Sequence, residues 1–365
     1  EDVLVRYLEY RGLRVERAIP LTDIEDKTIR EAIKKNRSLE DLTGGIEKIF
    51  IREAKSLNIR LPERPQRTSQ CIPTAVKLIE RLIRTGHAYR HESDVFFDPL
   101  SFDGFGKLYR LDMKKWPKKR IRYRRDTYHG NRWNLGDFIL WHGSREGDIK
   151  HWDTPIGRGR PSWNIQDPSV IIRHLGPQVD INCGGIDNIY RHHDYNIAIM
   201  ESYTGKEYAR CYLHGAHLLV DGKTMSKSRG NILYPEDIYA SGCAALDLRF
   251  FLIRTHYRKK LNFTRDHFKN TCDEIRSFRE LAGMLTRRVP GKKGKDPGVA
   301  KILRGLPREF ESAMDDDLRV GDAFEAVRRQ LLALAGLRER ISSDDSVRLR
   351  LILESIDSVL GVIHT

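Results

Sequence analysis

The clearest chemical signal in the sequence is the segment 221–231, DGKTMSKSRGN, which directly follows the apolar run 218–220. It carries small hydroxyl side chains, a glycine and the cations Lys223, Lys227 and Arg229. Cations on a loop that can close over a polyphosphate stabilise the charge that builds up when an α-phosphate is attacked and pyrophosphate leaves. A loop of lysine and serine alone is more often a solvated surface segment. The residues by themselves leave both interpretations open.

The composition favours an anionic partner. The chain has 365 residues, and its 65 Lys and Arg exceed its 51 Asp and Glu, which gives a formal charge of +14. Such a surplus favours nucleic acid or a phosphorylated ligand over an acidic protein. No apolar run approaches the roughly 20 residues of a membrane span, so we expect no membrane partner. Five scattered cysteines without a CxxC pair favour a reducing cytoplasm over a disulfide framework.

The elements that must position the loop change in type along the chain. Short apolar stretches alternate with helical patterns in two regions, which predicts the βα units of a parallel sheet. An aromatic and basic region with turn signals separates them, and helical patterns follow the loop. The predicted fold class is α/β, a doubly wound parallel sheet split by an insertion and followed by a C-terminal helical bundle. The predicted divisions are 1–89 and 152–222 for the two halves of the sheet, 90–151 for the insertion, 223–287 for the loop and first helices, 288–298 for a linker and 299–365 for the bundle.

MSKSRGN resembles the KMSKS loop of class I aminoacyl-tRNA synthetases, with Thr224 in place of the first Lys and Lys223 one position earlier. Nearly the whole chain resembles one family of these enzymes, the cysteinyl-tRNA synthetases. Five further stretches match the family in the same order, which is hard to produce by chance. They are RYLEYRG with LTDIEDK (6–12, 21–27), GHAYRHESDVFFDP (86–99), DFILW with GRPSWNIQD (137–141, 159–167), DINCGGIDNIYRHHDYN (180–196) and AMDDD (313–317).

The resemblance implies a Rossmann-like class I ligase. Such an enzyme uses ATP with Mg²⁺ to activate an amino acid as its adenylate and transfers the aminoacyl group to tRNA. Lys227 would be the catalytic cation, with Lys223 and Arg229 as substitutes for the absent first Lys. The implied ATP-binding residues are Gly184, Gly185, Asp187, Met225, Ser226 and Ser228. The implied amino-acid pocket consists of Thr22, Trp163, Asp167, Asn182, His192 and Asn196.

The implied pocket departs from the family at its metal site. The family holds the cysteine thiolate on a zinc ion bound by two Cys, one His and one Glu, and soft sulfur on Zn²⁺ discriminates strongly against serine. At the matching positions stand Asp167 instead of Cys, His192 as expected and Asn196 instead of Glu, while Asn182 replaces a further family His. Asp and His with a neutral Asn form a poor zinc site. We therefore expect no metal ligands, no zinc and a substrate other than cysteine.

Two family elements are missing from the sequence. The HIGH element is expected before Glu1. The run HGAH at 214–217 is similar to it in residue letters but not in its expected structural position. An anticodon-reading domain is expected after the bundle. The basic run 114–125 fits either an RNA acceptor end or a solvated face.

Three hypotheses stay open. The first is a synthetase that transfers an amino acid or related acyl group to tRNA. The second is a shortened ligase, similar to mycothiol cysteine ligase, whose acceptor is a small-molecule amine. The third is a catalytically silent RNA-binding or regulatory protein. In each case we expect a cytoplasmic monomer or homodimer.

Overall fold

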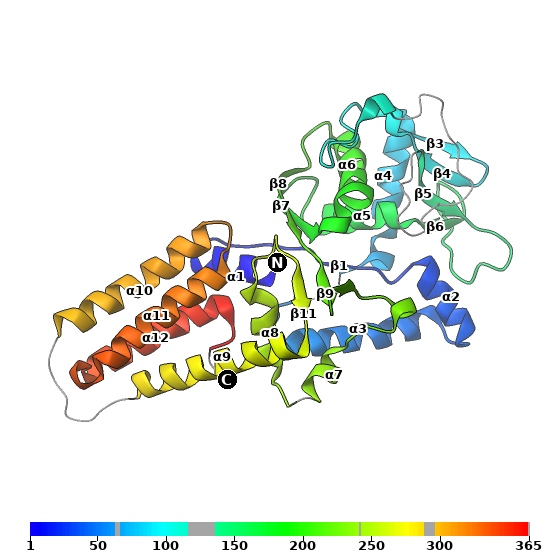
Figure 1. Cartoon of the computed structure of the whole chain (residues 1–365). Coiled ribbons are helices and arrows are strands. Elements are labelled where there is room, and N and C mark those ends of the chain that lie inside the picture. Colours follow the sequence, from blue (N-terminus) through cyan, green and yellow to red (C-terminus); the bar gives the residue numbers. More distant parts are fainter. Residues whose placement is uncertain (63–65, 116–135, 241, 288–295, 364–365) are drawn as a thin grey trace. The chain divides into compact units, whose positions relative to one another are not determined.

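The structure, a computed structural model, describes residues 1–62, 66–115, 136–240, 242–287 and 296–363 (Figure 1). The chain divides into two compact units. Unit 1 comprises residues 1–15, 52–60 and 215–365, and unit 2 comprises residues 16–51 and 61–214. No helix in the described ranges is long and apolar enough to cross a membrane. Most of the predicted linker 288–298 and most of the basic run 114–125 lie outside the described residues.

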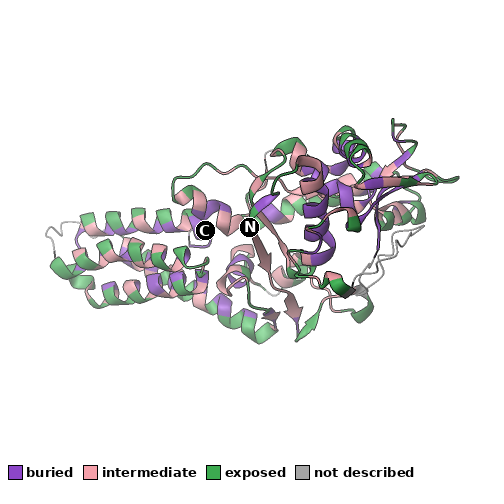
Figure 2. Cartoon of the chain, turned by 90° about the horizontal axis from the view of Figure 1, so that it is seen from above, coloured by how far each residue is buried: buried purple, intermediate pink, exposed green. Residues whose placement is uncertain are grey.

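Unit 2 contains an antiparallel sheet with the strand order β3-β4-β5-β6. Its two inner strands carry continuous apolar runs, which is typical of strands that are covered on both faces. The side chains from Val95 to Phe97 and from Phe138 to Trp141 are fully buried, and helices α4 and α6 complete this core. Figure 2 shows buried residues of the chain in purple. The bounds are β3 Ala88–His91, β4 Asp94–Phe97, β5 Phe138–Gly143, β6 Gly159–Pro161, α4 Ile72–Arg84 and α6 Tyr195–Thr204.

Two short strand pairs bring the predicted pocket segments of unit 2 together. β1 pairs in parallel with β2, and β7 pairs with β8. The chain leaves β7 through a 3-10 turn and a π-helical turn before α6 begins. The bounds are β1 Pro20–Leu21, β2 Gln66–Arg67, β7 Val179–Gly185, β8 Ala209–Gly215, α2 Asp26–Lys34, α3 Leu39–Ser56, α5 Trp163–His174, the 3-10 turn Ile186–Asn188 and the π-helical turn Ile189–Asp194.

Unit 1 contains a small sheet with β9 at its centre. β10 is antiparallel to β9, and β11 is parallel to it. The hairpin turn between β9 and β10 is Asp221-Gly222, and both residues have positive φ, as such two-residue turns require. The amide N–H of Gly222 donates to the Asn262 side chain of β11 (2.7 Å). The bounds are β9 Leu218–Val220, β10 Lys223–Thr224 and β11 Leu261–Phe263.

The rest of unit 1 is helical. Apolar side chains recur every three or four residues along α10, at Leu303, Leu306, Phe310 and Met314, so that one face of the helix is buried. This face packs with α1, α9, α11 and α12 around one core. The bounds are α1 Asp2–Tyr10, α7 Pro235–Tyr239, α8 Ala245–Arg254, α9 Arg265–Thr286, α10 Pro297–Asp315, α11 Val320–Gly336 and α12 Ser343–Leu360.

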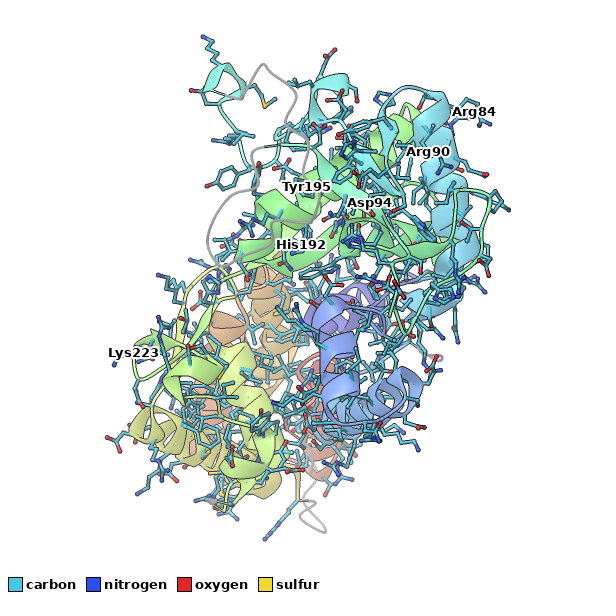
Figure 3. All side chains as sticks on the ribbon, turned by 90° about the vertical axis from the view of Figure 1, so that its right-hand side faces the viewer. Arg84, Arg90, Asp94, His192, Tyr195 and Lys223 are labelled. Atoms are coloured by element: carbon cyan, nitrogen blue, oxygen red, sulfur yellow. The ribbon has the colours of Figure 1, made fainter. Side chains whose placement is uncertain are left out.

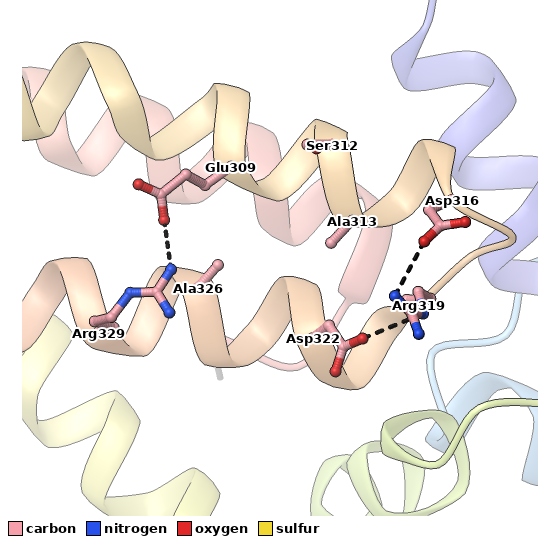
Figure 4. Close-up of a pocket in the computed structure, with 8 residues that line it drawn as sticks. All are labelled: Glu309, Ser312, Ala313, Asp316, Arg319, Asp322, Ala326 and Arg329. Carbon is pink, nitrogen blue, oxygen red and sulfur yellow. Dashed lines mark hydrogen bonds and ion pairs between the residues drawn. The ribbon is translucent and has the colours of Figure 1, made fainter.

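A pocket lies between α10 and α11 (Figure 4). Its charged side chains pair with one another across the helices, Arg329 with Glu309 (2.8 Å) and Arg319 with Asp316 (3.0 Å) and Asp322 (3.3 Å). These are exposed pairs, and none of the predicted site residues lines this pocket.

Candidate active site

Helix α5 carries Trp163 and Asp167, and three buried polar side chains near its start fix its position. Ser162 and Asn164 both donate to the carbonyl of Ile139 in β5 (2.6 and 2.8 Å). Gln166 donates to the carbonyl of Ile24 (2.7 Å). The loop after β1 is thereby attached to the helix that carries two of the predicted pocket residues.

The loop after β1 holds Thr22, which is exposed. Its neighbour Asp23 accepts from the hydroxyl of Thr68 (2.8 Å) and from the backbone N–H of Ser69 (2.9 Å). These bonds tie the loop to the turn that precedes α4. In the described part of the chain, Thr22 forms no hydrogen bond with the other predicted pocket residues, so its role in the pocket stays a prediction.

Asp167 on α5 and Asn196 on α6 influence each other electrostatically. Burial raises the pKa of Asp167 to about 6, and the side-chain amide of Asn196 acts in the opposite direction by favouring the charged carboxylate. The neighbouring Tyr208 accepts from the side-chain amide of Asn182 (2.8 Å), and its own pKa is raised well above its usual value, mainly by burial. A polar cluster thus forms from α5, α6, β7 and the residue before β8.

His192 lies on the π-helical turn and stacks on Trp163, with a tilted geometry and ring centroids 4.1 Å apart. His192, labelled in Figure 3, is a buried residue. Burial lowers the pKa of His192 to about 4, with Arg191 lowering it further and Asp187 opposing the shift. The imidazole is therefore neutral near pH 7 and presents an aromatic surface rather than a charge.

The glycine turn at the end of β7 is backed by a second histidine. A Cβ added to Gly184 would lie 2.6 Å from Cε1 and 2.8 Å from Nε2 of His193, and one added to Gly185 would lie 2.5 Å from Oδ1 of Asp187. The ring of His193 is buried, so a side chain at position 184 would force it to move, whereas the exposed Asp187 side chain could turn away from a Cβ at position 185. His193 Nδ1 is 2.9 Å from Nε2 of His214 on β8, and burial, His214 and His192 lower the pKa of His193 to about 3.

The donor set does not fit the zinc ion that the resemblance implies. Asn196 stands where the resemblance implies a Glu ligand, and a carboxamide is not among the usual zinc ligands. Over the described part of the chain, no group of three or more His, Cys, Asp and Glu side chains is arranged to hold a metal ion. That the protein works without zinc stays a prediction.

The signature loop in unit 1 is organised by its own side chains. Asn231 accepts from the N–H of Ser226 (3.0 Å) and donates to the carbonyl of Thr224 (3.2 Å). Met225 packs on an apolar cluster that includes Val220 and Phe251. The backbone of the loop is therefore fixed at both ends.

Two of the three predicted loop cations have described side chains. Arg229 donates to the carbonyl of Thr224 (3.0 Å) and to its hydroxyl, so it helps to close the loop. Lys223 is exposed on β10. Ser226 and Ser228 place their hydroxyls 3.2 Å apart. The side chain of Lys227 lies outside the described part of the structure, and its backbone is in a 3-10 turn, Lys227–Arg229.

The structure adds three residues that the sequence did not single out for the site, namely Tyr208, His193 and His214. Tyr208 is aligned by the pairing of β7 with β8, and His214 belongs to the HGAH run that imitates a signature motif. His193 and His214 are 21 residues apart in the sequence, and Tyr208 and its partner Asn182 are 26 apart, so that only the fold brings them together. The sequence offers one signal for these three residues. It is the presence of polar residues near the ends of the two apolar strands β7 and β8.

Comparison with known proteins finds, along the whole chain, the family that the sequence resembles. Residues 1–273 match the family model described as the tRNA synthetases class I (C) catalytic domain. A cysteine–tRNA ligase from Leptospira interrogans serovar Lai is 32% identical over 368 residues, which cover 100% of this chain and 78% of the relative. A cysteine–tRNA ligase from Chlamydia pneumoniae is 33% identical over 376 residues, with 100% and 77% coverage.

Solved structures extend the comparison to the fold. Methionyl-tRNA synthetase from Mycobacterium tuberculosis, bound by methionyl-adenylate, matches with a TM-score of 0.68 and 17% identity over 99% of this chain and 85% of that one. This likeness confirms the predicted α/β class, a Rossmann-like catalytic fold followed by C-terminal helices. Together with the match over residues 1–273, it means that the chain belongs to the class I aminoacyl-tRNA synthetases, in the family of the cysteinyl type.

Proposed function

We propose that the protein is an ATP-dependent ligase that activates an amino acid other than cysteine as its adenylate and transfers the aminoacyl group to tRNA. The observation that carries the proposal is the Asp167–Asn196 pair, which occupies two positions where the resemblance implies zinc ligands. Around this pair the chain keeps Trp163, His192 and the glycine turn. This pattern indicates a pocket whose residues are changed where the amino acid is selected and are retained elsewhere.

In this mechanism the glycine turn lets the backbone approach ATP. Gly184 and Gly185 carry no side chain, and Asp187 is exposed beside them as a ribose ligand. ATP enters with Mg²⁺. The cations of the loop 223–229 then balance the charge that develops on the α-phosphate as the carboxylate of the amino acid attacks and pyrophosphate leaves. Met225, Ser226 and Ser228 complete the nucleotide side.

The proposal includes the organisation of the chain. Residues 1–89 and 152–222 form the two halves of the catalytic domain around the insertion 90–151, and the helices after residue 222 support the loop and the acceptor. The protein acts in the cytoplasm as a monomer or homodimer. Transfer to tRNA is favoured because the relatives that match the entire chain are cysteine–tRNA ligases.

Amino-acid-dependent exchange of pyrophosphate into ATP tests the proposal. The assay compares all twenty amino acids, with cysteine and serine side by side, and non-standard amino acids are added to the panel. Exchange with an amino acid other than cysteine is the expected result. Exchange with cysteine alone would contradict the changed specificity, and no exchange with any acid would favour a silent paralogue.

The acceptor is tested separately, after the exchange assay has identified the activated amino acid. Transfer of the radiolabelled aminoacyl group to total tRNA, stable to protein removal and sensitive to mild base, is expected. Transfer to a small-molecule amine without labelled tRNA would instead favour the ligase similar to mycothiol cysteine ligase.

A further inference from the structure

We propose that Cys243 and Cys272 form a redox couple, in which a hydroperoxide oxidises the two thiols to a disulfide that joins the segment before α8 to α9. This inference goes beyond the proposed function, because the bond forms whether or not the protein makes an adenylate. It rests on the position of the two sulfur atoms. The S–H group of Cys272 donates to the sulfur of Cys243, and the two Sγ atoms are 3.2 Å apart.

Both cysteines are held in place within unit 1. Cys272 lies on α9 and is buried, whereas Cys243 lies two residues before α8 and is partly buried. The N–H of Ala244, the next residue, donates to the carboxylate of Asp247 (3.1 Å). That carboxylate accepts from Arg279 of α9 (2.6 Å). The backbone beside Cys243 is therefore anchored to the same helix that carries Cys272.

The two side chains are close enough for a disulfide to form with little movement. Bonded sulfur atoms are about 2.05 Å apart, so the two Sγ atoms at 3.2 Å have to approach by about 1.1 Å. Cys243 lies outside the helices. A small rotation of its side chain brings the sulfurs together without a change in α8 or α9.

The difference in burial assigns a separate step to each thiol. Burial raises the pKa of Cys272 to about 12, and the hydrogen bond to Cys243 acts in the same direction. Cys272 is therefore a thiol near pH 7, and the attacking nucleophile in such chemistry is a thiolate. The more accessible Cys243 reacts with the hydroperoxide first.

The oxidation balances in two steps. The Cys243 thiolate attacks one oxygen of the hydroperoxide, which forms a sulfenic acid and releases an alcohol, or water when the oxidant is hydrogen peroxide. The sulfur of Cys272 then displaces the hydroxyl of the sulfenic acid, and its own proton leaves with that hydroxyl as water. Two thiols and one hydroperoxide thus give one disulfide, one alcohol and one water.

The disulfide acts on the signature loop through packing. Met225 of the loop and Cys243 both pack against the apolar cluster that contains Phe251 and Cys272. A covalent bond in this cluster restricts the motion of the surface on which Met225 rests. Local opening of the loop then becomes less frequent, and its backbone amides exchange hydrogen more slowly.

The test compares the full chain in dithiothreitol with the same chain after a small molar excess of hydrogen peroxide. Trypsin places the two cysteines on different peptides, 230–249 and 270–276. After free thiols are blocked, mass spectrometry should recover these peptides as one cross-linked species that dithiothreitol separates. Hydrogen exchange of the segment 221–231 should be several-fold slower in the oxidised protein and should return to the reduced rate in dithiothreitol.

Two variants complete the test. Cys272→Ala should stop at a sulfenic acid on Cys243, which a dimedone probe labels, and its loop should exchange hydrogen equally fast with and without peroxide. Cys211→Ser, at an exposed position on β8, is the matched control and should behave like the wild type. Recovery of the two peptides unlinked from the peroxide-treated wild type would overturn this inference. Unchanged hydrogen exchange of the loop in the cross-linked protein would overturn the action on the loop.

Discussion

Gly184 allows the ring of His193 to approach the end of β7, and this contact predicts the effect of adding one methyl group. In Gly184→Ala the new Cβ would lie 2.6 Å from Cε1 of His193, so the ring must move and its hydrogen bond with His214 is lost. The free energy of unfolding should fall by about 1–3 kcal/mol, as measured by urea denaturation, and pyrophosphate exchange should slow.

Gly283→Ala is the control for this substitution. Gly283 lies within α9, and an added Cβ meets no atom within 4 Å. Alanine there should be neutral or stabilise the protein by up to about 1 kcal/mol. Equal stabilities for the two variants would contradict the account of the glycine turn.

The buried carboxyl group of Asp194 predicts that the stability of the fold depends on pH. It is fully buried and accepts from the backbone N–H groups of Leu108 and Tyr109 (both 3.0 Å). Burial raises its pKa to about 6, against the opposing effects of these bonds and of Lys107. Because the folded-state pKa lies above the unfolded value of about 4, protonation stabilises the fold below pH 4, and this contribution is lost as the pH rises through 6.

The Asp194→Asn variant isolates this contribution, since an amide does not titrate. The difference in unfolding free energy, wild type minus variant, should decrease by about 2 kcal/mol between pH 4.5 and pH 7. Urea denaturation at both pH values measures it. A difference that is constant or increases with pH would be the contrary result.

At the scale of elements, the signature loop is held in shape by side chains rather than by a longer strand. β10 contains only two residues, and Asn231 joins both sides of the loop through Ser226 and Thr224. A loop that is already ordered loses less entropy when it closes on ATP. We therefore propose that the amide of Asn231 positions the cations of the loop.

Asn231→Ala should slow pyrophosphate exchange about 10-fold through kcat, with little change in the KM for the amino acid, because loop order and not the pocket is affected. Steady-state exchange kinetics separate the two parameters. Asn270→Ala, at an exposed site on α9, serves as the control and should behave like the wild type. A change confined to the KM for the amino acid would argue against the positioning role.

At the scale of the whole molecule, unit 1 is assembled from three separate stretches, and a buried charge network joins them. Asp2 accepts from Arg6 (2.8 Å) and from Arg249 (2.6 Å). Arg249 also donates to the carbonyls of Leu57 (3.1 Å) and Leu360 (2.7 Å). The guanidinium side chains of Arg6 and Arg249 are only 3% exposed, so their charges depend on this carboxylate.

Asp2→Ala should lower the unfolding free energy by about 3–5 kcal/mol, because it leaves two buried cations without their partner. Arg319→Ala removes the exposed pairs seen in Figure 4 and should cost less than about 1 kcal/mol. Urea denaturation compares the two. Similar losses in both variants would contradict the importance of the buried network.

Local patterns in the sequence predicted the fold class and named most of the candidate site residues. The glycine turn is one continuous stretch of sequence and the signature loop is another, so the residues of each could be identified from the sequence. The Asp167–Asn196 contact could not be foreseen, because it joins two helices across 29 positions. β1 and β2 contain two residues each, which is too short for any alternation to be visible. The rest of the fold and of the site depends on packing between residues far apart in the sequence, which no local pattern encodes.

The central claim is that the loop cation Lys227 promotes adenylate formation, and the most direct test is the rate of amino-acid-dependent pyrophosphate exchange in the Lys227→Ala variant. The account predicts a decrease of about 10²- to 10³-fold, as for the loss of one preorganised charge-stabilising group. Lys269→Ala, at an exposed position on α9, should retain the wild-type rate. An unchanged rate in Lys227→Ala would remove this residue from the mechanism and contradict the account.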